Sequence, residues 1–171
     1  FQAANQIAFN VSAMTFMVGV GLGVAAMIRA GNQKGLSDFV SLRRITLSIF
    51  LLTLLIEIVF ASLFFILRDW LPTLYLDTEN ISKVIENKEV ILIASKLLLI
   101  VALFQIFDGL QVVVLGALRG MQDVKIPTIM TFVAYWMIGF PICYYLGLHT
   151  PLKSTGIWIG LLISLISASI M

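Results

Sequence analysis

Five apolar runs, each about as long as a lipid bilayer is thick, occupy most of this sequence. A helix needs roughly 20 mostly apolar residues to cross the hydrocarbon core, because each residue adds only about 1.5 Å. A window of that size predicts spans at about residues 4–28, 45–67, 90–118, 127–148 and 155–171. We therefore expect an all-α transmembrane fold, a bundle of five membrane-spanning helices.

The composition supports the same fold class. Apolar residues make up 60% of the 171 residues and charged residues only 12%. A soluble globular domain has roughly 25% charged residues, so a soluble fold of this chain would lack the polar side chains needed to cover its core. Membrane lipid is therefore the expected environment of the apolar surface.

The composition also argues against several classes of function. A net charge of +2 is too small to suggest a nucleic-acid partner. Cys143 and His149 are the single cysteine and the single histidine, which leaves no disulfide framework and no multi-histidine metal site. No nucleophile–base pair is apparent in the sequence. We therefore expect neither an enzyme nor a bound cofactor.

The basic residues predict an orientation in the membrane. One set of helix ends carries Arg29, Lys34, Arg43, Arg44, Arg119 and Lys125. The other set carries Arg68, Lys83, Lys88 and Lys153, with Lys96 just inside the third run. Because short cytoplasmic loops are enriched in Lys and Arg, we expect the loops after the first and third helices to lie in the cytoplasm.

An ionisable side chain inside an apolar span needs a physical reason, since it costs at least about 2.5 kcal/mol at mid-bilayer depth. Asp108 lies within the third run, and Gln105 and Gln111 flank it on one broad helix face. Such a carboxylate is expected to take up a proton or to hold Na⁺. A structural carboxyl, hydrogen-bonded to a neighbouring helix, is the alternative, and the residues alone do not decide between them.

Glu57 is the second candidate carboxylate. It lies near the centre of the second run and has no polar neighbours in the sequence. This isolation weakens the hypothesis of a site, and Glu57 would then face a helix outside this chain or pair with a group that the chain does not contain. Lys96 lies close enough to the bilayer surface for its ammonium to reach the headgroups.

Several further residues are candidates for lining a cavity or forming a hinge. Gln6 and Asn10 recur at helical spacing on the first run, where they line a cavity or hydrogen-bond to a neighbouring helix. Tyr135 and Trp136 would line a cavity for flat organic cations through cation–π contacts, with bulk packing as the alternative. Pro141, inside the fourth run, predicts a kink and a hinge.

Three glycines, Gly19, Gly21 and Gly23, alternate along the first run. They are similar to a phosphate-binding loop only superficially, because no strand precedes them and apolar residues flank them. Close packing of helices or a local bend is the interpretation that we favour.

Three stretches of the sequence are distinctive enough to compare with a known family. They are AANQIAFNVSAMTFMVGVGLGVAAMIRAGNQKG, then GALRGMQDVKIP followed by YWMIGFP, and finally WIGLLISL. Together they resemble one lobe of the multidrug and toxic compound extrusion (MATE) transporters, and the NorM-like branch most of all. The resemblance covers nearly the whole chain.

The resemblance implies a transporter of twelve helices in two six-helix lobes. Its members exchange Na⁺ or H⁺ for cationic drugs across the cytoplasmic (inner) membrane. The chain would then form a partial C-terminal lobe, the eighth to twelfth helices. The N-terminal lobe and the first helix of this lobe would be partners outside it. Asp108 matches the carboxylate of the family's cation site, so Na⁺ at Asp108 is the only metal expected. Phe16 stands where some relatives have a tyrosine near the substrate, and Glu57 matches no family motif.

We therefore expect a multi-pass antiporter that exports cationic drugs and toxic organic compounds. Asp108 would bind the coupling ion, Na⁺ or H⁺, and Gln6, Asn10, Gln105 and Gln111 would line the polar part of the lobe. A lipid-linked oligosaccharide flippase of a related superfamily is one alternative, and it should show a large basic cavity. A non-transporting structural membrane subunit is another. It should keep Asp108 and the stripe of Gln2, Gln6 and Asn10 fully hydrogen-bonded, with no cavity beside them.

Overall fold

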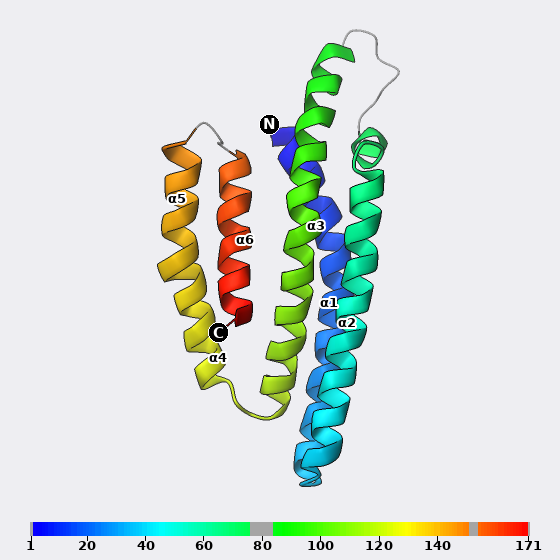
Figure 1. Ribbon diagram of the computed structural model, residues 1–171, viewed down its shortest axis with the longest axis vertical. Coiled ribbons are helices and arrows are strands. Elements are labelled where there is room, and N and C mark those ends of the chain that lie inside the picture. The colour runs from blue at the N-terminus through cyan, green and yellow to red at the C-terminus, as the bar shows by residue number, and fades with distance from the viewer. Residues whose placement is uncertain (1, 76–83, 151–153, 171) are drawn as a thin grey trace.

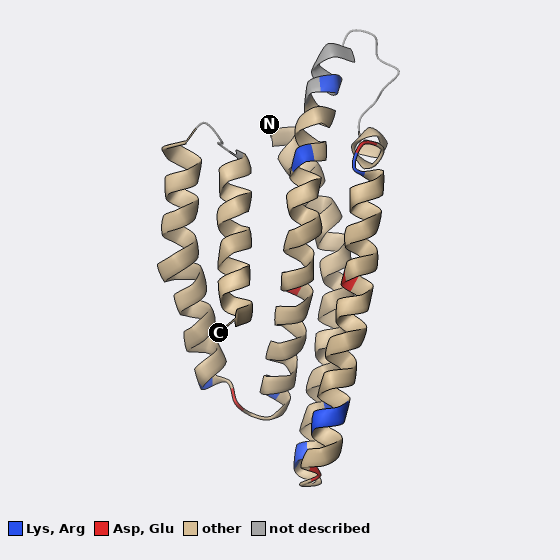
Figure 2. Ribbon diagram, viewed as in Figure 1, with Lys and Arg blue, Asp and Glu red and all other residues tan. Residues whose placement is uncertain are grey.

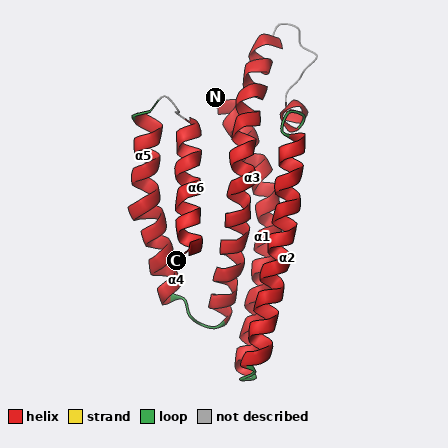
Figure 3. Cartoon of the chain, viewed as in Figure 1, coloured by secondary structure: helices red, strands yellow, loops and turns green. Residues whose placement is uncertain are grey.

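The computed structural model describes residues 2–75, 84–150 and 154–170. Within these ranges every regular element is a helix and no strand is present (Figure 3). The three long helices are α1 (Gln2–Gly35), α2 (Phe39–Leu67) and α3 (Val84–Gly120). A fourth rod consists of α4 (Lys125–Phe132), the π-helical segment η3 (Val133–Gly139) and α5 (Phe140–Leu148). The remaining elements are the short 3-10 helix η1 (Leu71–Tyr75) and α6 (Ser154–Ile170).

The membrane-spanning fold class predicted from hydropathy is confirmed. Four rods are long and apolar enough to cross a membrane, namely Gln2–Gly35, Phe39–Leu67, Val90–Gly120 and Lys125–Leu148. Helix α6 is a fifth apolar helix with 17 residues, which is about the shortest length that can span the hydrocarbon core. The chain is a multi-pass membrane protein.

The helices extend beyond the apolar runs. α1 continues to Gly35 instead of ending near residue 28, and α2 begins at Phe39 instead of near residue 45. Only a tight turn separates them, in which Ser37 has a positive φ of 58°. The side chain of Asp38 then caps α2 by accepting a hydrogen bond from the Ser41 N–H at 3.0 Å. Helix α3 likewise begins at Val84, before the apolar run. Hydropathy cannot detect these extensions, because they consist of polar turns added to an existing helix.

Helix α3 is the central element of the bundle. It packs against α1, α2 and α6, and α6 in turn packs against α5 and η3 (Figure 1). The main buried cluster joins small and branched side chains of α1 and α3 to one aromatic residue each from α2 and α6. Its members are Ala4, Ile7, Ala8, Val11, Phe64, Ala94, Leu97, Leu98, Val101, Ala102 and Trp158. Any group on the middle of α3 is therefore within reach of three other helices.

Charged residues lie mainly toward the ends of the rods, but α2 and α3 each carry an acidic position about halfway along (Figure 2). The turn after α1 and the turn after α3 lie at the same end of the bundle, since the Lys34 ammonium donates a hydrogen bond to the Met121 carbonyl. The basic residues that predict a cytoplasmic side are thus gathered at one end. Which side of the membrane that end faces stays a prediction.

Candidate functional site

Glycines bring α1 and α3 together backbone to backbone. A methyl group added at Gly116 would overlap the Gly23 carbonyl, and one added at Gly120 would overlap the Met27 carbonyl. Gly21, in contrast, has no neighbouring atom within 4 Å of such a methyl group. The close packing expected of the first-helix glycines is therefore present at Gly23, while Gly21 faces open space.

The same absence of side chains makes room for Glu57. Its carboxyl lies against the backbone of Gly109, where a methyl group would overlap one carboxylate oxygen. A methyl group on Gly19 would lie 3.4 Å from the Gly109 Cα and 3.6 Å from Glu57 Oε1. Glu57 is only 1% exposed. The structure thus places Glu57 inside the bundle, between α1 and α3, and not toward a segment outside the chain.

Gln105 is the polar neighbour that the local sequence of Glu57 lacks. It is 4% exposed, and its Nε2 donates a hydrogen bond to the backbone carbonyl of Glu57 at 3.4 Å. Two buried oxygens, Gln105 Oε1 and Glu57 Oε2, have no hydrogen-bond partner in the part of the chain that the structure describes. Both oxygens are hydrogen-bond acceptors when Glu57 is ionised, so they cannot form a hydrogen bond with each other.

Asp108 lies between this pair and a second polar pair. On α3 it stands one helical turn after Gln105 and one turn before Gln111. The Tyr135 hydroxyl donates to Gln111 Oε1 at 2.9 Å, which links η3 to α3. Asp108 itself is half-buried, and no hydrogen bond or ion pair joins it to any described residue. The structure therefore gathers Asp108, Gln105, Gln111 and Tyr135, and adds Glu57 to them.

The other sequence candidates lie elsewhere. On α1 the Gln6 amide donates to Asn10 Oδ1 at 3.1 Å, on an exposed part of the helix. Phe16 is also exposed, and Trp136 is 63% exposed and stacks between two phenylalanines of its own rod. These side chains do not contribute to the polar group around Asp108.

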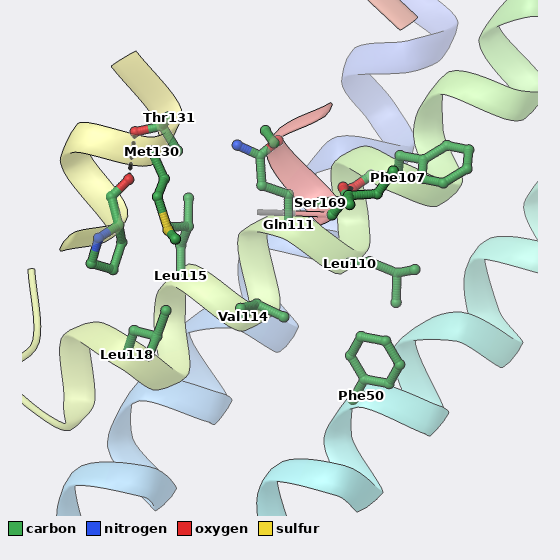
Figure 4. A pocket seen from close by; sticks show the side chains of 13 residues that line it. Phe50, Phe107, Leu110, Gln111, Val114, Leu115, Leu118, Met130, Thr131 and Ser169 are labelled. Atoms are coloured by element: carbon green, nitrogen blue, oxygen red, sulfur yellow. Dashed lines mark hydrogen bonds between the residues drawn. The ribbon is translucent and has the colours of Figure 1, made fainter. Parts of the chain in front are cut away.

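A cavity of about 310 Å³ opens beside this group, between α2, α3, α4 and α6 (Figure 4). Most of its lining is apolar, including Phe50 and Met130, while Gln111, Thr131 and Ser169 supply polar groups. This size and lining match the small end of the range for pockets that bind organic ligands. Sequence analysis did not single out Phe50 or Met130, because an apolar residue that lines a cavity has the same local pattern as one that packs.

Pro141 is the second residue of α5, and α5 directly follows the π-helical segment. A π-helical turn inserts an extra residue into the helix and is frequent at functional sites. The sequence predicted a kink from Pro141 but gave no signal for the wider turn before it. A hinge at this position stays a prediction.

Comparisons of the sequence with known proteins show its family. The sequence model of the MatE family matches residues 3–145. The probable multidrug resistance protein NorM of Rhodopseudomonas palustris is 40% identical over 164 residues, which cover 96% of this chain and 34% of that protein. The multidrug resistance proteins NorM of Photobacterium profundum and Vibrio vulnificus are 36% and 37% identical, and each alignment covers 99% of this chain and 36% of the relative. The chain thus spans about a third of the length of these relatives. Because the family model covers most of its residues, the chain belongs to the MatE family, within which it is similar to the NorM proteins.

Proposed function

We propose that this chain is part of a multidrug efflux antiporter, which exchanges Na⁺ or H⁺ for cationic organic compounds across the cytoplasmic membrane. The observation that carries the proposal is Asp108, a half-buried carboxylate in a membrane span with no hydrogen bond or ion pair to the described residues. An ionisable group in that position is costly, and reversible cation binding is a function that explains its presence. The names of the NorM relatives support the efflux of drugs.

The cavity beside Asp108 supports the proposal that the substrate is an organic compound. Phe107 and Gln111, which flank Asp108 on α3, both line it. A compound bound there would rest on apolar and aromatic surface while its cationic group lay near the carboxylate. Displacement of the small cation by the organic cation then follows from charge, because one carboxylate cannot neutralise both in a low-dielectric site.

The two alternatives fit the geometry less well. A structural subunit should hold the carboxyl of Asp108 in hydrogen bonds and leave no cavity next to it. Among the described residues Asp108 has no hydrogen-bond partner, and a cavity lies beside it. A lipid-linked oligosaccharide flippase should have a large basic cavity. The lining of the cavity beside Asp108 contains no Lys or Arg.

The proposal is tested with the full-length natural protein in proteoliposomes loaded with a fluorescent cationic dye. We expect dye to leave its compartment faster when a Na⁺ or a proton gradient is imposed in the opposite direction. Applying each gradient separately identifies the coupling ion. A rate of dye movement that is unchanged by either gradient would contradict antiport. An absence of dye movement would contradict efflux of this substrate class.

The orientation in the membrane is testable by labelling single cysteines in intact cells. In a Cys143→Ala background, cysteine at Gln122 should be shielded from an impermeant thiol reagent, and cysteine at Asp69 should react. Gln122 lies in the turn after α3, and Asp69 follows α2 at the opposite end of the bundle. Labelling at Gln122 and protection at Asp69 would reverse the orientation predicted from the basic residues.

A further inference from the structure

Glu57 carries an ionisable group inside the bundle, and no described residue forms an ion pair with it. The carboxyl lies against the backbone of Gly109, where a methyl group would overlap it, and Gly19 faces the same carboxyl across the helix crossing. It is almost completely buried, as is Gln105 beside it. Side chains that merely fill space in an α-helical core are apolar, so a carboxyl placed at this helix crossing calls for a function.

The donors near Glu57 are already committed to other acceptors. Gln105 uses its amide N–H on the Glu57 backbone carbonyl, and the Thr53 hydroxyl donates to the Ile49 carbonyl at 2.8 Å. What remains is a pair of oxygen acceptors, Glu57 Oε2 and Gln105 Oε1, with no donor for either among the described residues. Each of these oxygens needs a hydrogen-bond donor or a cation, and a carboxylate oxygen beside an amide oxygen is a ligand set that suits a small cation. A proton on Oε2 would turn one acceptor into a donor, and Na⁺ would be held by both oxygens.

The charged residues of the helices around Glu57 do not fill this role. Asp108 directly precedes Gly109, whose backbone contacts the Glu57 carboxyl, and it carries the same charge as Glu57. The other charged groups with described side chains on α1, α2 and α3 lie toward the helix ends. They are Arg29, Lys34, Arg43, Arg44, Lys88, Lys96 and Arg119. In the described ranges the one ion pair joins Arg68 to Asp69, which follow α2.

We propose that Glu57 and the Gln105 side-chain oxygen bind a second monovalent cation, Na⁺ or H⁺, which is exchanged together with the cation at Asp108. This inference rests on the proposed antiport and deepens it. Repulsion between the two neighbouring carboxylates couples the sites, because a cation on either one removes a charge that disfavours the ionised form of the other. Loading both sites would leave the crossing of α1, α2 and α3 neutral. Releasing both would leave two negative charges, of which a monovalent organic cation could neutralise one and a divalent organic cation both.

The test counts cations bound to the purified full-length protein. Bound radioactive Na⁺ is measured in one arm, and proton uptake from a weakly buffered solution with a pH-sensitive dye in the other. Glu57→Gln keeps the size of the side chain but cannot bind a cation through a charge. We expect this variant to bind one cation fewer than the wild type. The loss should appear in the Na⁺ measurement if the ion is Na⁺ and in the proton measurement if it is H⁺. Asp108→Asn should also lose one cation, and the double variant should lose two.

An unchanged cation count in Glu57→Gln would overturn the inference, since a carboxyl that serves packing or hydrogen bonding alone is replaced by an amide without loss of a bound ion. If that variant does not fold, Gln105→Met decides, because it leaves Glu57 in place and removes only the amide oxygen. We expect its apparent affinity for the driving cation to fall at least about tenfold, as when a partner of a metal site is removed. Unchanged affinity would contradict the site, and Gln33→Met, near the end of α1, is the matched control.

The outcomes separate this inference from the proposed function. If the wild type does not exchange dye for either ion, the antiport proposal fails whatever the cation count. If the wild type exchanges dye and the count is the same in Glu57→Gln, the antiport proposal stands with Asp108 as the cation-binding residue of this chain, and the second site is excluded.

Discussion

Asp108→Asn is expected to reduce gradient-driven dye efflux to the level of protein-free liposomes. The amide has nearly the size and shape of the carboxylate, so the variant should insert in the membrane and fold normally. It lacks the negative charge that a bound Na⁺ requires and cannot take up a proton at neutral pH. The measurement is dye efflux from proteoliposomes under an imposed Na⁺ or proton gradient, with protein content matched between samples.

Asp123→Asn is the control for this prediction. It makes the same chemical change in an exposed residue of the turn between α3 and α4, away from the polar group around Asp108. We expect its efflux to equal that of the wild type. If Asp108→Asn still responds to the gradient, the coupling ion does not bind at Asp108. A loss of response in Glu57→Gln but not in Asp108→Asn would place that ion on α2 alone.

Gly116→Ala should cause a large loss of stability, because Gly116 lies at the close contact between α1 and α3. The added methyl group would overlap the Gly23 carbonyl oxygen, which is part of the α1 backbone and cannot rotate away as a side chain can. The two helices would have to separate. Overpacking of this kind costs about 1–3 kcal/mol, and more where the backbone cannot shift. The apparent melting temperature should fall by several degrees, measured in detergent by fluorescence-detected size-exclusion chromatography after heating.

Gly21→Ala is the matched control, because a methyl group at Gly21 meets no atom within 4 Å. Alanine favours a helix over glycine by about 1 kcal/mol, so this variant should be as stable as the wild type or slightly more so. Equal melting temperatures for the two variants would show that α1 and α3 do not approach as closely as the structure has them. Gly120→Ala, which meets the Met27 carbonyl, should behave like Gly116→Ala.

The membrane spans and the candidate Asp108 could be predicted from the sequence by itself. In lipid the backbone must satisfy its own hydrogen bonds, so a long apolar run in a chain of this kind has the helix as its solution. A carboxylate within such a run is conspicuous because moving it out of water into the span is costly, and the residue type alone shows this. The family could be predicted too, since it rests on residues adjacent in the chain. The ends of α1 and α2 could not, because polar helical turns outside the lipid carry no hydropathy signal.

Only the tertiary structure shows the surroundings of Glu57. In the sequence it has no polar neighbours, and Gln105, which contacts it, is 48 positions away. Gly109 contacts its carboxyl only once α2 and α3 pack together, and in the sequence Gly109 is merely a residue without a side chain. The same holds for the cavity beside Asp108, whose lining comes from four separate helices. Hydropathy depends only on the residues within one segment, whereas a binding site depends on which segments contact one another.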